Sequence, residues 1–306
     1  MVTMDGLEPR AIDPPGGNVA DHLARHVGRL ADEIGERNVW HPAALRAAAR
    51  YIRDEWAEQG YVVREQTYEA GGLRCANIEA VASDERGGPS IVIGAHYDSV
   101  LGSPGANDNA SGIAALLELS RSFTASDLPL RFVAFVNEES PFFATSLQGS
   151  EVYARHARRD GVNIDLMISL ETLGYYSTHE RSQAYPPLLA RFYPPRGDFV
   201  AIVSNLRGLA KLKRFVKAFR ASTPFPVEYL ASPAFVPGVS WSDHRAFWRH
   251  GYAALMVTDT AFYRYPHYHT ALDTADRVCC TELAEVTRGL AGAIRRYGEH
   301  ALRAQP

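Results

Sequence analysis

The stretch IGAHYDSVLGSPGANDNASG, residues 93–112, joins the end of an apolar run to a loop rich in glycine and other small residues. His96 and Asp98 lie at the end of the run, and Asp108 lies in the loop, where the pattern predicts that a helix begins. Such a run is typical of a strand that is buried on both faces of a sheet. The stretch therefore predicts a buried strand that brings polar side chains to the carboxyl edge of a sheet.

Short continuous apolar runs of the same kind recur after residue 90. The runs are SIVIGAHY, LRFVAFVN, DLMISLET, FVAIVSN and AALMVTD. Helical stretches are predicted at 109–123, 149–159, 207–220 and 281–303. Because strands and helices alternate, the pattern predicts a three-layer α/β/α sandwich, with helices on both faces of a parallel or mixed sheet.

The N-terminal part of the chain has a different pattern. Residues 18–36 and 41–59 show the apolar spacing of helices, and YVVREQTY and CANIEAVA alternate like strands. Residues 1–17 are predicted to be a disordered lead. Because the rest of the chain shows no linker, internal repeat or low-complexity segment, we expect residues 18–306 to form a single domain.

Composition and charge exclude several classes of partner. The net charge of −3 gives no reason to expect nucleic acid or an anionic membrane as a partner. No apolar run reaches the ~20 residues that a membrane helix needs. The N-terminus lacks the apolar segment of a signal peptide, and the three cysteines do not make a disulfide framework. We therefore expect a cytoplasmic protein.

Polar residues gather where the predicted strands end, which is where open α/β sheets bind ligands. They are His96, Asp98, Asp108, Glu138, Glu139, Glu171 and His269. Singly, each has a structural explanation, such as a helix N-cap at Asp108 or solvated charge at Glu138 and Glu139. Together they favour a bound cation, because side-by-side carboxylates repel one another unless a cation or solvent lies between them.

The ligand types indicate zinc. Imidazole combined with carboxylate suits zinc, nickel, iron or manganese better than calcium or magnesium. Two histidines and three carboxylates exceed the needs of one tetrahedral ion with an open position. They fit two ions that share a bridging carboxylate, roughly 3.5–4 Å apart. A phosphate-binding loop and a nucleophile elbow are both absent from the sequence.

Taken as an ordered set, AHYDS, GANDNASG, NEE, a strand-end acid and YH near the C-terminus resemble the co-catalytic di-zinc aminopeptidases of metallopeptidase family twenty-eight. Relatives in that family include glutaminyl cyclases and glutamate carboxypeptidases. The resemblance covers roughly residues 75–275. It implies a mixed, mostly parallel eight-stranded sheet in one zinc-peptidase catalytic domain. It also implies metal-activated hydrolysis that removes the N-terminal residue of a peptide or small amide substrate.

The resemblance implies five zinc ligands for two ions per chain. His96 matches a ligand of the first zinc, Asp108 the bridging ligand, Glu139 a ligand of the second zinc and His269 the last ligand. Glu171 departs from the pattern, because the family usually has aspartate there.

Glu171 has a competitor within the same predicted strand. The segment Glu171-Thr172-Leu173-Gly174 matches a family segment of the type Asp-Met-Ile-Gly. Glutamate can bind the metal with one more methylene. Asp165 lies earlier on the strand, so we expect it to be too far from the carboxyl edge, and we keep Glu171 as the ligand.

Three residues match catalytic roles in the family. Glu138 matches the general base, Tyr268 a tyrosine that hydrogen-bonds the oxyanion, and Asp98 the aspartate that orients His96 through its other ring nitrogen. His267 is two residues from His269, and if this segment is extended the two side chains point to opposite faces, so only one can reach the metals.

Several alternatives remain open at this level. A glutaminyl cyclase-like acyltransferase would use the same scaffold, often with one zinc, and a non-catalytic relative would have lost ligands that are present here. Asp243, in the segment SDHRAFW, either supports the site or is a helix N-terminal acid. The segment 175–240, rich in Tyr, Phe and Pro, is expected to shape the substrate pocket.

Overall fold

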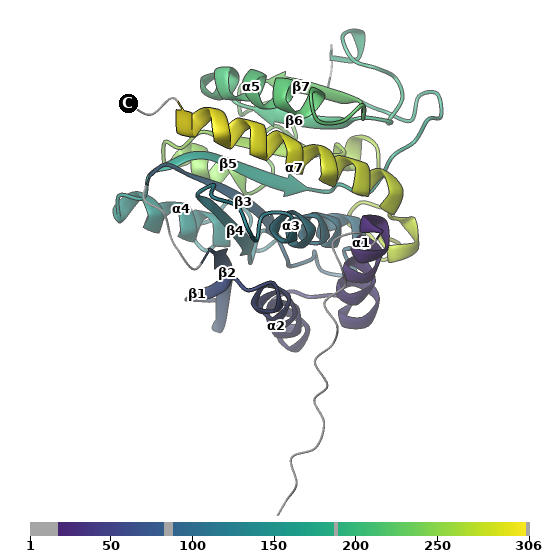
Figure 1. Ribbon diagram of the computed structural model, residues 1–306. Helices are drawn as coiled ribbons and strands as arrows, with labels where there is room; N and C mark the ends of the chain where they lie inside the picture. Colours follow the sequence, from purple (N-terminus) through teal and green to yellow (C-terminus); the bar gives the residue numbers. More distant parts are fainter. Residues whose placement is uncertain (1–17, 83–87, 187–188, 304–306) are drawn as a thin grey trace, which may run out of the picture.

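The computed structural model describes residues 18–82, 88–186 and 189–303 (Figure 1). The predicted disordered lead at 1–17 lies outside the described residues. None of the described helices is both long enough and apolar enough to cross a membrane.

Eight strands form one sheet, in the order β1-β2-β4-β3-β5-β8-β6-β7. The strands are β1 (Val62–Ala70), β2 (Leu73–Val81), β3 (Ser90–His96), β4 (Leu130–Phe135), β5 (Ile164–Glu171), β6 (Val200–Ser204), β7 (Val227–Ala231) and β8 (Ala254–Thr258). The pairs β3–β4, β3–β5, β5–β8 and β6–β7 are parallel, and β1–β2, β2–β4 and β6–β8 are antiparallel. The predicted mixed, mostly parallel sheet is confirmed.

Helices cover both faces of the sheet (Figure 1). They are α1 (Val19–Gly28), α2 (Pro42–Glu58), α3 (Gly112–Arg121), α4 (Gly149–Arg159), α5 (Leu209–Arg220), α6 (His244–Arg249) and α7 (Cys280–Arg303). A π-helical segment, Arg29–Ile34, continues α1, and another, Ala106–Ser111, precedes α3. Short 3₁₀ turns occur at Leu189–Arg191, Leu206–Gly208, Ala261–Tyr263 and Ala275–Arg277.

The two faces of the sheet belong to two different cores. Ile91 and Ile93 of β3 pack in the larger core with α1, α2, α3, α5 and α7. Val92, between them, packs in a smaller core with α4 and α6. Successive side chains of a strand point to opposite faces, so a central strand must be apolar throughout to bury both. This is why SIVIGAH was recognisable as a buried strand from sequence.

One strand was missed by the sequence analysis. Strand β7 lies at the edge of the sheet, and four of its five residues are only half-buried. Its sequence, VEYLA, includes a glutamate and lacks the continuous apolar character of the inner strands. An edge strand has only one neighbour and part of its surface in solvent, so its apolar signal is weaker.

A close approach in the central sheet requires a glycine at position 94. A Cβ atom there would lie 2.3 Å from Cε2 of Phe135, whose ring packs edge-on against Phe247 of α6. We expect Gly94→Ala to lower the free energy of unfolding by about 1–3 kcal/mol, because overpacking forces neighbouring side chains or backbone to shift. Urea denaturation of the variant and the parent protein measures the difference.

Gly28→Ala is the matched control. Gly28 has φ of −59°, and a Cβ there would meet only an oxygen of Asp32 at 3.9 Å. Replacing a helical glycine by alanine without a clash should leave stability unchanged or raise it by roughly 0.5–1 kcal/mol. Equal destabilisation by both substitutions would contradict the packing argument for Gly94.

Candidate metal centre

The five side chains proposed as ligands meet at the carboxyl edge of the sheet. His96 and Glu171 are the last residues of β3 and β5, and Asp108 lies in the π-helical segment before α3. Glu139 follows β4, and His269 lies in the turn region after β8. The strands β3, β4 and β5 are parallel neighbours, so their ends lie side by side and deliver these groups to one place.

The five side chains form two groups that share Asp108. In the first group, His96 Nε2 lies 3.2 Å from Asp108 Oδ1 and 3.5 Å from Glu171 Oε2. In the second, His269 Nε2 lies 3.0 Å from Asp108 Oδ2 and 3.4 Å from Glu139 Oε1. Each oxygen of Asp108 therefore faces a different histidine and a different second carboxylate. This is the geometry of a carboxylate that can bridge two cations.

Several of these ligand atoms are buried without a hydrogen-bond partner. They are Nε2 of His96, both carboxylate oxygens of Asp108 and Oε1 of Glu139. A buried polar atom without a partner is costly and rare in folded proteins. A cation in each group would satisfy all of these atoms. Imidazole nitrogen with carboxylate oxygen is a ligand set that zinc accepts, so the residues present fit two zinc ions.

The protonation equilibria show how much negative charge is concentrated here. Burial, together with Asp108, raises the pKa of Glu139 to about 7. Burial, together with Glu139 and Glu171, raises the pKa of Glu138 well above its usual range. Burial opposes protonation of His269, but contact with Asp108 and Glu139 outweighs it and raises that pKa to about 10. These shifts all favour the addition of positive charge to the cluster, and divalent cations would supply such charge.

Asp98 supports the site through both its main-chain carbonyl and its carboxylate. Its main-chain carbonyl lies 3.1 Å from Nδ1 of His96, whereas its carboxylate Oδ1 is 3.6 Å from that nitrogen. The carboxylate instead accepts hydrogen bonds from the main-chain N–H groups of Glu138 and Glu139, both at 3.1 Å. The sequence analysis expected the carboxylate to orient His96. The structure adds that this carboxylate fixes the turn that carries both glutamates.

Asp165 and Glu171 lie in different surroundings. Ser242 donates a hydrogen bond of 2.7 Å to Oε2 of Glu171 within the site. Asp165 binds Lys211 and accepts a hydrogen bond of 2.9 Å from the hydroxyl of Tyr297 on α7. Asp165 is therefore engaged away from the ligand groups, and Glu171 is the strand residue that reaches them.

Tyr268 lies at the site, as expected, and His267 lies outside the ligand groups, as expected. Tyr268 stacks on the imidazole of His269, with ring centroids 3.8 Å apart, and lines the cavity described below. His267 packs edge-on against Tyr265 and belongs to neither ligand group. The segment is a turn, not an extended strand, so the alternation argument used for these histidines does not apply. His269 reaches the site with φ of +60°.

Asp243 is fully buried just before α6, but its side chain does not cap that helix. Its Oδ1 accepts a hydrogen bond of 3.4 Å from Gln148, and its Oδ2 has no hydrogen-bond partner. Burial raises its pKa to about 7, and charges of His96 and Glu171 act on it. The alternative of a helix N-terminal acid therefore does not describe its contacts.

Sequence analysis missed the groups that hold Asp108 in place. The carboxylate of Asp273 accepts hydrogen bonds from the main-chain N–H groups of Asn107, at 2.8 Å, and Asp108, at 3.1 Å. The side chain of Asn107 donates to Asp259 at 2.8 Å and accepts from the N–H of Gly174 at 2.7 Å. The two asparagines beside Asp108 were the only sequence feature that could have indicated this hydrogen-bond network. Asp259 and Asp273 are distant in sequence and resemble ordinary loop residues.

Arg37 was also missed, although it holds the loop between His96 and Asp108. Its buried guanidinium donates to the carbonyl oxygens of Tyr97, at 2.7 Å, and Gly105, at 2.8 Å. Burial lowers its pKa to about 10, which still leaves it charged at neutral pH. Because the guanidinium of Arg37 binds main-chain oxygens, it stabilises the loop. It also adds positive charge near the carboxylates of the site.

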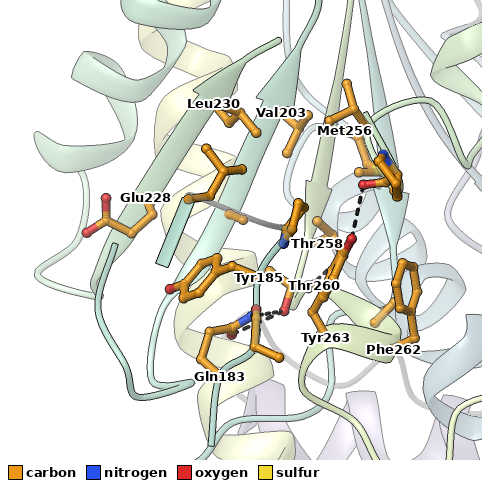
Figure 2. Close-up of a pocket in the computed structure, with 18 of the residues that line it drawn as sticks. Gln183, Tyr185, Val203, Glu228, Leu230, Met256, Thr258, Thr260, Phe262 and Tyr263 are labelled. Carbon is orange, nitrogen blue, oxygen red and sulfur yellow. Dashed lines mark hydrogen bonds between the residues drawn. The ribbon is translucent and has the colours of Figure 1, made fainter. Parts of the chain in front are cut away.

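A cavity adjoins the metal-ligand groups at Glu171 and Tyr268 (Figure 2). It lies over β8, β6 and β7, on the sheet face where Met256 and Val203 form a small apolar cluster. Helix α6 packs against β5 and β8. Loop segments form the remaining walls, and the segment 175–240 supplies most of the lining, as expected from its composition.

The sequence profile described as Peptidase family M28 matches residues 77–294. The chain belongs to this family. A protein of Escherichia coli strain K12 named "Uncharacterized protein YfbL" is 37% identical over 282 residues, which cover 88% of this chain and 86% of that protein. The "Probable aminopeptidase YDR415C" of Saccharomyces cerevisiae is 28% identical over 222 residues, 68% of this chain and 53% of its own length. The family resemblance drawn from the five motifs is confirmed.

Solved structures show the same fold at low sequence identity. The zinc aminopeptidase BSAP of Bacillus subtilis has a TM-score of 0.71 at 15% identity, covering 90% of this chain and 94% of that one. A glutaminyl cyclase of Porphyromonas gingivalis has a TM-score of 0.65 at 18% identity, covering 92% and 98%. Proteins with these two names therefore share the fold of this chain.

The bridging position of Asp108 has a direct consequence for metal content. We expect Asp108→Ala to bind neither zinc, because Asp108 is the one described residue that belongs to both ligand groups. His269→Ala should lower zinc content, whereas His267→Ala should leave it near that of the parent protein. Metal analysis after dialysis against buffered zinc measures all three variants. Equal loss in the two histidine variants would contradict the assignment of His269.

The support that Asp273 gives to Asp108 can be tested separately. Asp273→Asn keeps the size of the side chain but leaves one acceptor oxygen for two N–H groups. We expect zinc affinity to fall roughly 10–100-fold, the usual effect of removing a partner that orients a metal ligand. Competition with a chelator measures the affinity. The matched control is Asp276→Asn, which changes an exposed aspartate three residues away and should not alter zinc affinity.

Proposed function

We propose that this chain is a zinc-dependent aminopeptidase that removes the N-terminal residue of peptides. The observation that carries the proposal is the placement of Asp108, whose two oxygens face two separate histidine–carboxylate groups beside the buried Glu138. Membership of peptidase family M28 supports hydrolysis of a peptide bond. The aminopeptidases among its relatives and structural neighbours support an exopeptidase.

The five ligands would hold two zinc ions, with Asp108 shared between them. Zinc supplies an acidified water molecule and polarises the scissile carbonyl when it is bound. Glu138 then acts as the general base, taking a proton at its carboxylate and returning it to the leaving amine. Burial and the neighbouring carboxylates Glu139 and Glu171 raise the pKa of Glu138, which favours uptake of a proton by its carboxylate.

Tyr268 and the cavity act on the substrate. Tyr268 lines the end of the cavity next to Glu171, where its hydroxyl can donate to the oxyanion that forms on the attacked carbonyl. Stacking on His269 limits the freedom of the phenol ring. The cavity next to the ligand groups receives the side chain of the N-terminal residue. A concave, mostly apolar cavity with a few polar groups is typical of a small-molecule or side-chain subsite.

A panel of substrates tests the reaction type. Aminoacyl arylamides and a peptide with N-terminal glutamine are incubated with the zinc-loaded protein, and both arylamine release and cyclised product are measured. Release of arylamine supports the aminopeptidase. Cyclisation of the glutaminyl peptide without hydrolysis of any arylamide would replace the proposal by a glutaminyl cyclase-like acyltransferase on the same scaffold. Zinc binding without turnover of any substrate would indicate a non-catalytic relative.

Glu138→Gln and Glu139→Gln should separate the base from the ligand. Glu138→Gln keeps the shape of the side chain but cannot take the proton, so it should bind about two zinc ions and lose activity by a factor on the order of 10²–10⁴. Glu139→Gln weakens the second ligand group, so it should lose zinc first and regain part of its activity in excess zinc, by mass action.

The measurement is a zinc titration of each variant with turnover as the readout. Rescue of Glu138→Gln by zinc, with no rescue of Glu139→Gln, would mean that the two roles are reversed. Full activity in both variants would place the chemistry elsewhere.

A further inference from the structure

The floor of the cavity contains a row of four residues that runs across the sheet from the metal-ligand groups to the edge strand. Glu171 pairs with Thr258, Thr258 with Ala201, and Ala201 with Glu228. Residues that pair directly in neighbouring strands point to the same face. All four line the same cavity. A carboxylate therefore stands at each end of the row, with one small hydroxyl residue and one alanine between them.

The neighbouring row is apolar. Met256 pairs with Val203, and Val203 pairs with Leu230. Tyr185 and Tyr193 also line the cavity and stack on each other, with ring centroids 5.7 Å apart, and the hydroxyl of Tyr193 donates to the main-chain carbonyl of Tyr229 on β7. Figure 2 shows Glu228 at the β7 end of the cavity, opposite Met256 and Phe262. A side chain that enters from the metal end thus crosses an apolar surface before it reaches Glu228.

Among the described residues, the carboxylate of Glu228 makes no ion pair and no hydrogen bond. Arg220 acts on it from a distance, but its guanidinium lies over the ring of Tyr229 and donates to the carbonyl of Val227. Tyr229 alternates with Glu228 along β7, so the two side chains leave opposite faces of the strand.

We propose that Glu228 selects substrates whose N-terminal residue has a long cationic side chain, lysine or arginine. This inference rests on the proposed aminopeptidase function. The apolar row contacts the methylene stem, and Glu228 binds the cationic head at the partly exposed end of the cavity. The faces of Tyr185 and Tyr193 add a favourable contact for a cation.

The length of the row fits such a side chain. Three strand spacings of about 4.8 Å separate the main chain of Glu171 from that of Glu228, which gives roughly 14 Å. An extended lysine side chain covers about 6 Å of this distance, given bond lengths near 1.5 Å. The rest is divided between the side chain of Glu228 and the groups that bind the substrate backbone near Glu171. A short apolar side chain would leave the Glu228 end of the row unfilled.

A long apolar side chain fits less well for an electrostatic reason. It would cover the carboxylate of Glu228 and remove water from it without providing a partner, which costs free energy. A cationic side chain replaces that water with an opposite charge. The preference for a cationic over an apolar side chain of the same length therefore depends on the charge at position 228.

The kinetic test compares arginine with citrulline, its neutral counterpart of the same shape, as N-terminal residues of otherwise identical substrates. We expect the zinc-loaded parent protein to favour arginine in kcat/KM on the order of tenfold, the usual worth of one charged partner in a partly exposed site. Glu228→Gln should bring the ratio close to one, and Glu228→Lys should bring it below one. Glu180→Gln removes an exposed charge outside the cavity and should leave the ratio as in the parent.

A binding test needs no catalysis and separates the two proposals. Butylguanidinium and its neutral counterpart butylurea are titrated into the full-length, zinc-loaded protein and into Glu228→Gln, with ligand NMR as the readout. Preference for butylguanidinium that is lost in Glu228→Gln supports the role of Glu228 even if no arylamide is hydrolysed. In that case only the aminopeptidase proposal fails.

Arylamide hydrolysis with equal kcat/KM for arginine and citrulline would overturn the role of Glu228 and leave the aminopeptidase proposal intact. An equal fall of the ratio in Glu180→Gln would also overturn it, since the effect would then be one of net charge.

Discussion

The concentration of buried carboxylates at one edge of the sheet is the constraint on which the site depends. Asp108, Glu138, Glu139 and Glu171 are all buried, and His96 and His269 face the ligand groups that these carboxylates form. Charges of one sign cannot be kept together away from water unless opposite charge lies between them. The two histidine–carboxylate groups and the unpartnered atoms of Asp108 show where that charge belongs. The arrangement fits the two cations proposed for this site.

Such a cluster requires a scaffold that keeps its members in place when the cations are absent. The fold meets this need mainly with main-chain hydrogen bonds. Asp98 fixes the turn of Glu138 and Glu139 through their N–H groups, and Asp273 holds the N–H of Asp108 in the same way. Arg37 binds the carbonyl oxygens of the loop between the first histidine and the bridging aspartate. Preorganisation of this kind lowers the cost of bringing like charges together, because the backbone does not have to be ordered by the metal.

Features with a local sequence pattern could be predicted from the sequence. Features that depend on contacts between distant parts of the chain could not. Buried central strands are apolar on both faces, so their ends, and the polar residues that follow, could be located without coordinates. Strand β7 could not, because an edge strand has a mixed composition. Arg37 and Asp273 act on Asp108 from distant parts of the chain, and nothing in their local sequence distinguishes them from surface charges. His269 was named through a motif, while the backbone argument for it assumed an extended segment that is in fact a turn.

Different strands of the sheet carry the residues proposed for catalysis and the residues proposed for substrate selectivity. The ends of β3, β4 and β5 carry the groups proposed to hold metal and transfer protons, and β8, β6 and β7 carry the floor of the cavity. Glu171 belongs to both parts, because it closes one ligand group and begins the row of residues that ends at Glu228. Changes on the outer strands can therefore alter which side chain is accepted without moving a ligand atom. This division is consistent with one fold supporting peptide hydrolysis and glutaminyl cyclisation, since function depends on the site and not on the architecture that carries it.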